Sequence, residues 1–216
     1  MIELLIAQNR IHLWKHEDVL TVIARGFETD STQIIAALVG TFVIYVLEFV
    51  WHMMLPFHVN TLKSFGESSS VLDKISEDAS DDGMYFAPNF HLQIKAAEGD
   101  EKKELMLKQQ ESMSNGPVVF LSYKSTGTGG FGTSLGIQFI CDFITMIIAA
   151  YLVTQLGGDE FGSQITIVML VALSGIVTNM VPLWNWFVFS SAYLKVHAIS
   201  VLINWAIAGT VLIKML

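Results

Sequence analysis

Several ionisable side chains lie inside long apolar stretches of this 216-residue sequence, where charge is costly and often marks a functional site. They are Glu48, His52, Asp142, Lys195 and His197, accompanied by the amides Asn179 and Asn204. Glu48 and His52 are four residues apart, so a helix places both on one face. Asp142 and Lys195 have opposite charges at similar depth, and we expect them to form an ion pair.

These residues predict one contiguous polar site in one half of the apolar region. With a rise of 1.5 Å per residue, Glu48 lies roughly 10 Å and Asp142 roughly 13 Å from the same surface. The other half offers only neutral polar side chains, which disfavours a continuous ion pore. Two interpretations stay open: a polar network that fixes the helix register, or a cavity for a metal, a proton or an amphipathic molecule. The candidate binding residues are Glu48, His52, Asp142, Asn179, Lys195 and His197.

Histidine and methionine also gather where the first apolar stretch ends. The candidate metal ligands are His52, Met53, His58 and His91. Imidazole and thioether groups together suit copper. Methionine is equally an ordinary apolar residue, however, and no compact ligand repeat appears, so we expect no cofactor.

Two glycine-rich motifs resemble nucleotide sites but lack the context that such sites need. Gly157–Phe161 spells the GGDEF signature of diguanylate cyclases, yet it fills a short turn between two apolar stretches. Gly127–Gly132 fits G-x-G-x-x-G without the second strand and acid of a dinucleotide site. We expect a hinge there, and close helix packing at Gly132 and Gly136. Without a nucleophile–base pair either, we predict that the protein is not an enzyme.

Four apolar stretches must position these side chains, and each is long enough to cross a bilayer, which takes roughly 20 residues. They are residues 33–55, 133–156, 163–187 and 192–216. A composition of 52% hydrophobic and 15% charged residues is typical of membrane proteins. The predicted fold class is an all-α membrane protein, a bundle of four transmembrane helices with a small α+β extramembrane cap between the first two.

The rest of the chain forms two extramembrane segments. Residues 1–32 predict either an amphipathic helix at the membrane interface or a poorly ordered lead-in. Residues 56–132 form the cap, which we expect to be too poor in apolar residues to fold well alone. It is expected to hold strands at 84–86, 91–94 and 118–123, a helix at 100–112 and a short helix within 67–83.

Charge and cysteine content limit the partners and the topology. The net charge of −8 argues against nucleic acid as a partner. The single cysteine, Cys141, excludes an intramolecular disulfide. Long loops cross membranes largely regardless of their charge, so we expect cytoplasmic termini and a cap on the opposite, periplasmic side.

Four motifs resemble a set of uncharacterised bacterial membrane proteins. The motifs are Trp51-His52-Met53-Met54-Leu55-Pro56-Phe57-His58, Gly83-Met84-Tyr85-Phe86-Ala87-Pro88-Asn89, Gly116-Pro117-Val118-Val119-Phe120 and Val181-Pro182-Leu183-Trp184-Asn185-Trp186. This resemblance implies a multi-pass protein of the bacterial inner (cytoplasmic) membrane and implies no activity.

Together these features favour a non-catalytic subunit or binding protein of a membrane complex. Its cap and the aromatic residues at the membrane surface would contact a protein partner or a second copy of the chain. The alternative is a small transporter or sensor that uses a polar site formed by Glu48, Asp142 and Lys195 within the bundle.

Overall fold

The computed structural model describes residues 30–66, 70–127 and 129–216. Within them the chain is mostly helical, and four helices are long and apolar enough to cross a membrane: Ser31–Met54, Phe131–Leu156, Phe161–Trp186 and Ser191–Met215. Each begins and ends within two residues of a predicted stretch, so this part of the fold prediction is confirmed. The expectation for residues 1–32 falls almost entirely outside the described residues.

Two of the four long helices contain a π-helical turn. The first consists of α3 (Ser31–Phe49) and the π-helical turn η1 (Val50–Met54). The third consists of α8 (Phe161–Gly175), the π-helical turn η3 (Ile176–Met180) and α9 (Val181–Trp186). The second and fourth are α7 (Phe131–Leu156) and α10 (Ser191–Met215). Such π-helical turns are rare in proteins overall, but those that occur are often found at functional sites. The turn η1 contains His52.

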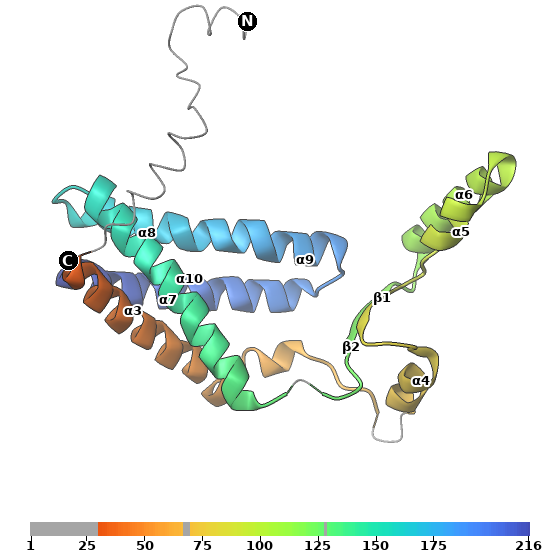
Figure 1. The fold of residues 1–216 in the computed structure, drawn as a ribbon, viewed down its shortest axis with the longest axis horizontal. Helices are drawn as coiled ribbons and strands as arrows, with labels where there is room; N and C mark the ends of the chain where they lie inside the picture. The colour runs from red at the N-terminus through yellow and green to blue at the C-terminus, as the bar shows by residue number, and fades with distance from the viewer. Residues whose placement is uncertain (1–29, 67–69, 128) are drawn as a thin grey trace, which may run out of the picture.

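The long helices pack where small residues let their backbones approach. Helix α3 packs against α7 and α10, and α8 packs against α10 and α7 (Figure 1). An added Cβ at Gly209 would lie 2.5 Å from Cγ1 of Val168, and one at Gly40 would lie 3.0 Å from Sδ of Met146. The close contact expected at Gly132 and Gly136 was wrong for this chain, because both glycines are exposed with nothing within 4 Å of an added Cβ.

The far ends of α3 and α7 are joined by polar contacts. Asp30 and Gln33 form a capping box at the start of α3, in which the side chain of each accepts a hydrogen bond from the backbone N–H of the other. The Gln33 amide also donates to Thr154 Oγ1 on α7 at 2.7 Å. The hydrogen bond that joins the two helices at this end is therefore made by two uncharged side chains.

The segment between the first two long helices holds five short elements and one longer helix. These are η2 (Val59–Thr61), α4 (Val71–Asp78), β1 (Gly83–Ala87), α5 (His91–Ala96), α6 (Gly99–Asn115) and β2 (Val119–Tyr123). Strands β1 and β2 pair antiparallel, from Gly83 opposite Tyr123 to Ala87 opposite Val119. The strands predicted at 84–86 and 118–123 and the helix predicted at 100–112 are confirmed.

The strand predicted at 91–94 was wrong, because this stretch forms α5 and pairs with α6. The Gln109 side chain on α6 accepts a hydrogen bond from Phe90 N and donates one to the Pro88 carbonyl. Asn89 Oδ1 accepts from the N–H of His91. These side-chain bonds turn the chain towards α6 and take the place of a strand ladder.

This segment has very little core of its own. Of its described hydrophobic residues, Ala97 is buried, whereas Leu72, Leu92 and Leu107 are largely exposed. Phe120 of β2 contacts Phe187, directly after α9, with ring centroids 4.8 Å apart. Figure 1 shows the β1–β2 ribbon leading from the long helices to the α5–α6 pair. The small buried area agrees with a segment that depends on neighbours for stability.

Candidate functional site

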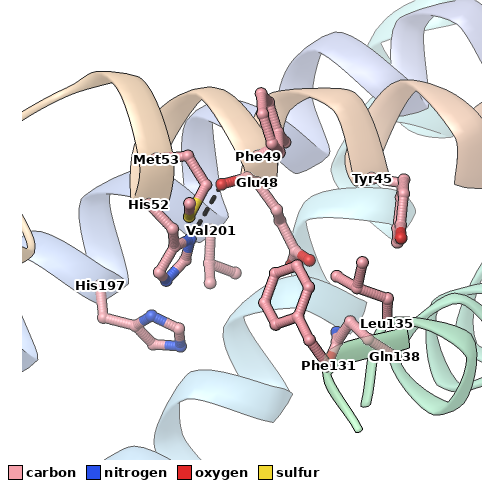
Figure 2. A pocket seen from close by; sticks show the side chains of 10 residues that line it. All are labelled: Tyr45, Glu48, Phe49, His52, Met53, Phe131, Leu135, Gln138, His197 and Val201. Carbon is pink, nitrogen blue, oxygen red and sulfur yellow. Dashed lines mark hydrogen bonds between the residues drawn. The ribbon is translucent and has the colours of Figure 1, made fainter. Parts of the chain in front are cut away.

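A cavity of about 540 Å³ lies among the ends of α3, α7 and α10. Its lining is mostly aromatic and aliphatic, with four polar side chains (Figure 2). The lining residues are Tyr45, Glu48, Phe49, His52, Met53, Phe131, Leu135, Gln138, His197 and Val201. Glu48 and His52 share a helix face, as their spacing predicted, and α10 adds His197. This volume and lining are typical of small-molecule sites.

Two carboxyl groups occur on this side of the helices without a cationic neighbour. The Glu48 carboxylate points into the cavity, towards Gln138 (Figure 2). Asp142 is half-buried, and its Oδ1 accepts a hydrogen bond of 3.0 Å from Gln138 Nε2. Its Oδ2 is buried without a hydrogen bond. No basic nitrogen of the described residues comes within 4.0 Å of either carboxylate.

The ion pair expected between Asp142 and Lys195 is therefore wrong. The ion pairs among the described residues are in the segment between the first two long helices, where Lys74 pairs with Glu77 and Asp78, and Lys103 pairs with Asp100. Lys195 is exposed on α10, and α10 packs mainly on α3 and α8 and only slightly on α7, which carries Asp142. Similar depth along two helices did not make these residues neighbours.

Asn179 also lies apart from the other candidate binding residues. It is exposed within η3, and its amide donates to the Gly175 carbonyl of the same helix at 3.1 Å. The structure thus brings Glu48, His52 and His197 to one cavity and places Asp142 beside it.

Three histidines from different segments converge next to the cavity. One ring nitrogen from each of His52, His58 and His197 lies within 4.8 Å of the other two. The His52 and His58 rings stack with centroids 4.1 Å apart, and His197 lies 5.8 Å from His58. Among the described residues, no further group of three histidine, cysteine, aspartate or glutamate side chains has ligand atoms close enough to share an ion.

The local chain path explains how His52 and His58 meet. The π-helical turn η1 ends at Met54, and Leu55 is extended ahead of Pro56. The N–H of Asn60 then donates to the Pro56 carbonyl at 3.0 Å, which starts a tight turn. This reversal carries His58 back against η1 and leaves its side chain only 5% exposed.

The hydrogen bonds of the cluster define which nitrogens are free. His52 Nδ1 lies 2.9 Å from the Glu48 carbonyl oxygen, which can only accept, so Nδ1 carries a proton and, in the neutral ring, Nε2 holds the lone pair. Neither nitrogen of His58 makes a well-formed hydrogen bond, and His197 Nδ1 is buried without one. Burial, and then the neighbouring His52, lower the pKa of His58, while a weak backbone contact with Trp51 opposes them.

Aromatic rings surround the three imidazoles. Tyr193 stacks on His197 with centroids 5.9 Å apart and lies 6.3 Å from His58. The rings of Trp51 and His58 are nearly perpendicular, with their centroids 6.3 Å apart. These rings restrict the orientation of the imidazoles and make their surroundings apolar.

The metal-ligand prediction placed two of four residues in this cluster. His52 and His58 belong to it, whereas Met53 faces the cavity with 61% exposure and His91 is exposed on α5 in the cap. His197 was foreseen only as a polar binding residue. Its depth near the same membrane surface as His52 was the signal that could have linked them.

Comparisons with protein-family models, with curated proteins and with solved structures give no match to this chain. The resemblance to the bacterial membrane set therefore stays a sequence-based expectation.

Proposed function

We propose that this protein is a four-helix membrane protein that binds a small amphipathic cation in the cavity between α3, α7 and α10. In this role it acts as a transporter or sensor and not as an enzyme. The observation that carries the proposal is the Glu48 carboxylate on the wall of a largely apolar cavity, with Asp142 hydrogen-bonded to the lining residue Gln138.

Charge balance favours a cation as the occupant. A carboxylate in an apolar site is costly unless it is paired, and Glu48 and Asp142 have no basic partner within 4.0 Å among the described residues. A positive ligand supplies that partner. The rings of Tyr45, Phe49 and Phe131 in the wall add favourable cation–π contacts, each worth about 0.5–2 kcal/mol.

Size and shape favour an organic cation over a bare metal ion at this position. The cavity of about 540 Å³ lies within the range of about 300–1,000 Å³ that small-molecule sites occupy. Aliphatic residues such as Leu135 and Val201 line it and offer no ligand atoms for a metal. A ligand with an apolar body and one positive charge can contact the apolar side chains of the wall and pair with the Glu48 carboxylate.

Binding of tetraphenylphosphonium to the full chain in lipid nanodiscs tests this proposal. Tetraphenylborate has nearly the same shape and the opposite charge, so it tests whether the site recognises the sign of the charge. We expect saturable binding of the cation alone. Glu48→Gln should weaken it at least tenfold, about 1.4 kcal/mol, because the paired charge is lost.

Glu77→Gln is the matched control variant, since Glu77 is an exposed residue of α4 in the cap. It should bind the cation as the unmodified chain does. Saturable binding of both probes, with no effect of Glu48→Gln, would contradict a cation site.

A second candidate function, a subunit of a membrane complex, is supported by the α5–α6 pair. Leu92, Met106 and Leu107 are exposed there, and a groove of about 650 Å³ runs past Ile94 and Met106. An apolar surface of this kind often marks a protein interface. Stable co-purification with a larger assembly, lost in Leu107→Glu, supports this role.

We place the protein in the bacterial cytoplasmic membrane, with both termini in the cytoplasm and the cap in the periplasm. The four apolar helices, the motif resemblance and the length of the cap support this placement. The cavity and the histidine cluster then open towards the periplasmic side, where small cations and metal ions arrive from outside.

A further inference from the structure

We propose that His52, His58 and His197 form a binding site for a divalent late transition-metal ion, with an open coordination position that faces the cavity. This site goes beyond the proposed cation binding, because it uses a different ligand class and includes His58, which does not line the cavity.

The distances permit coordination after small side-chain rotations. A tetrahedral zinc ion with Zn–N bonds of about 2.0–2.1 Å holds its nitrogen ligands about 3.3–3.4 Å apart. The three histidine nitrogens already lie within 4.8 Å of one another. His52 is exposed on η1, so its ring can shift slightly while it keeps its Nδ1 hydrogen bond, whereas the buried His58 is held by its turn.

The protonation pattern suits metal binding. Metal-ligating histidines commonly donate their second N–H to a backbone carbonyl, which fixes the ring and its tautomer. His52 does this through Nδ1 and the Glu48 carbonyl at 2.9 Å. Its Nε2 is then the ligand atom, ready before any metal arrives.

His58 gives the strongest indication of an occupant. It is 5% exposed, and neither ring nitrogen makes a well-formed hydrogen bond. Leaving such a buried polar group unpaired costs about 1–3 kcal/mol, and native proteins rarely do so without a reason. A metal ion bound to one of these nitrogens removes much of that cost.

The chemistry of the donors selects the class of metal. Three imidazoles suit Zn²⁺, Cu²⁺ and Ni²⁺, whereas Ca²⁺ and Mg²⁺ require oxygen ligands. No carboxylate or cysteine of the described residues belongs to the group. Three protein ligands leave a fourth position, as in zinc sites that bind water or a substrate. His52 and His197 also line the cavity, so that position is open to the cavity.

A bound ion would also connect separate parts of the fold. His52 and His58 belong to the end of the first long helix and the turn after it, whereas His197 belongs to α10. The ion would therefore fasten the start of the cap segment to the fourth long helix. Metal binding should for this reason raise the stability of the whole chain.

Equilibrium dialysis of the metal-stripped full chain against Zn²⁺, with metal content measured by mass spectrometry, tests the site. We expect one Zn²⁺ per chain. His58→Phe and His197→Phe should each weaken binding by at least about 100-fold, because even outer-shell changes cost about 10–100-fold. His91→Phe is the matched control, since His91 is exposed in the cap and outside the cluster, and should leave binding unchanged.

X-ray absorption of the zinc-loaded, unmodified chain keeps the test independent of how the variants fold. Three or four nitrogen or oxygen neighbours at about 2.0–2.1 Å are expected, with imidazole scattering beyond them. Substoichiometric zinc, or zinc that His91→Phe removes and His58→Phe does not, would overturn the proposal. Binding of tetraphenylphosphonium to His58→Phe is expected to persist, so failure of the metal site and failure of the cavity proposal give different results.

Discussion

At the scale of single residues, the polar groups near the cavity include carboxyl groups that lack a cation and two imidazoles, His58 and His197, with buried nitrogens that make no hydrogen bond. Asp142 belongs to the first kind. Its Oδ1 accepts from Gln138, its Oδ2 has no hydrogen bond, and Lys195 does not pair with it. A side chain that cannot be ionised should be tolerated at this position, because the asparagine oxygen can still accept from Gln138.

A double-mutant cycle of Asp142→Asn and Lys195→Met tests this description. We expect Asp142→Asn to leave stability unchanged or to raise it by about 1 kcal/mol, since an unpaired, partly buried charge is removed. The effects of the two changes should add to within about 0.3–0.5 kcal/mol, as they do for residues that do not interact. Thermal unfolding in detergent provides the measurement. A coupling energy above about 1 kcal/mol would show that Asp142 and Lys195 do interact, and would contradict this description.

At the scale of elements, close approach of α8 and α10 depends on one glycine. Gly209 faces Val168, and an added Cβ would lie 2.5 Å from Val168 Cγ1 and 3.2 Å from its Cβ. Valine is stiff at χ1 within a helix, so it cannot easily move aside. Gly136 on α7 differs, because its Cβ position is open.

Alanine at these two glycines should have opposite effects. Gly209→Ala should destabilise the protein by about 1–3 kcal/mol, since overpacking forces the two helices apart. Gly136→Ala should be neutral or stabilise it by roughly 0.5–1 kcal/mol through better helix propensity. Unfolding in mixed detergent, monitored by circular dichroism, measures both. Equal behaviour of the two variants would show that α8 and α10 do not pack through Gly209.

At the scale of the whole molecule, topology decides which compartment the cap, the cavity and the histidine cluster face. With all four of the helices that are long enough to cross a membrane spanning it, the loop after α3 and the loop between α7 and α8 would lie on opposite sides. Glu77 on α4 and Asp159 in the α7–α8 turn are exposed and mark the two loops.

Cysteine labelling of intact bacterial cells tests this arrangement in a Cys141→Ala background, because Cys141 is a free, exposed thiol. An impermeant maleimide should label Glu77→Cys and should label Asp159→Cys only after the cells are opened. The reverse pattern would place the cap in the cytoplasm. Labelling of both positions from one side would contradict four crossings.

The sequence by itself determined the elements whose signal is local. About 20 consecutive apolar residues must be shielded from water wherever they occur, so the four long helices could be located closely. The shared face of Glu48 and His52 followed equally from helix periodicity. Aromatic and β-branched residues bounded by turn residues likewise indicated β1 and β2, because these preferences depend on neighbouring residues alone.

Only the tertiary structure decided which side chains meet. Depth along a helix predicts the level of a residue but not the direction it faces, and α7 and α10 contact each other only slightly, which separated Asp142 from Lys195. The same packing, with α3 against α10, joined His197 to His52. The turn at Pro56 brought His58 into the histidine cluster. Sequence spacing alone does not show that the side chain of His58 points towards His52 and His197. Helix rotation and pairing are set by side-chain packing across the whole molecule, and a histidine cluster drawn from distant segments forms only once that packing is complete.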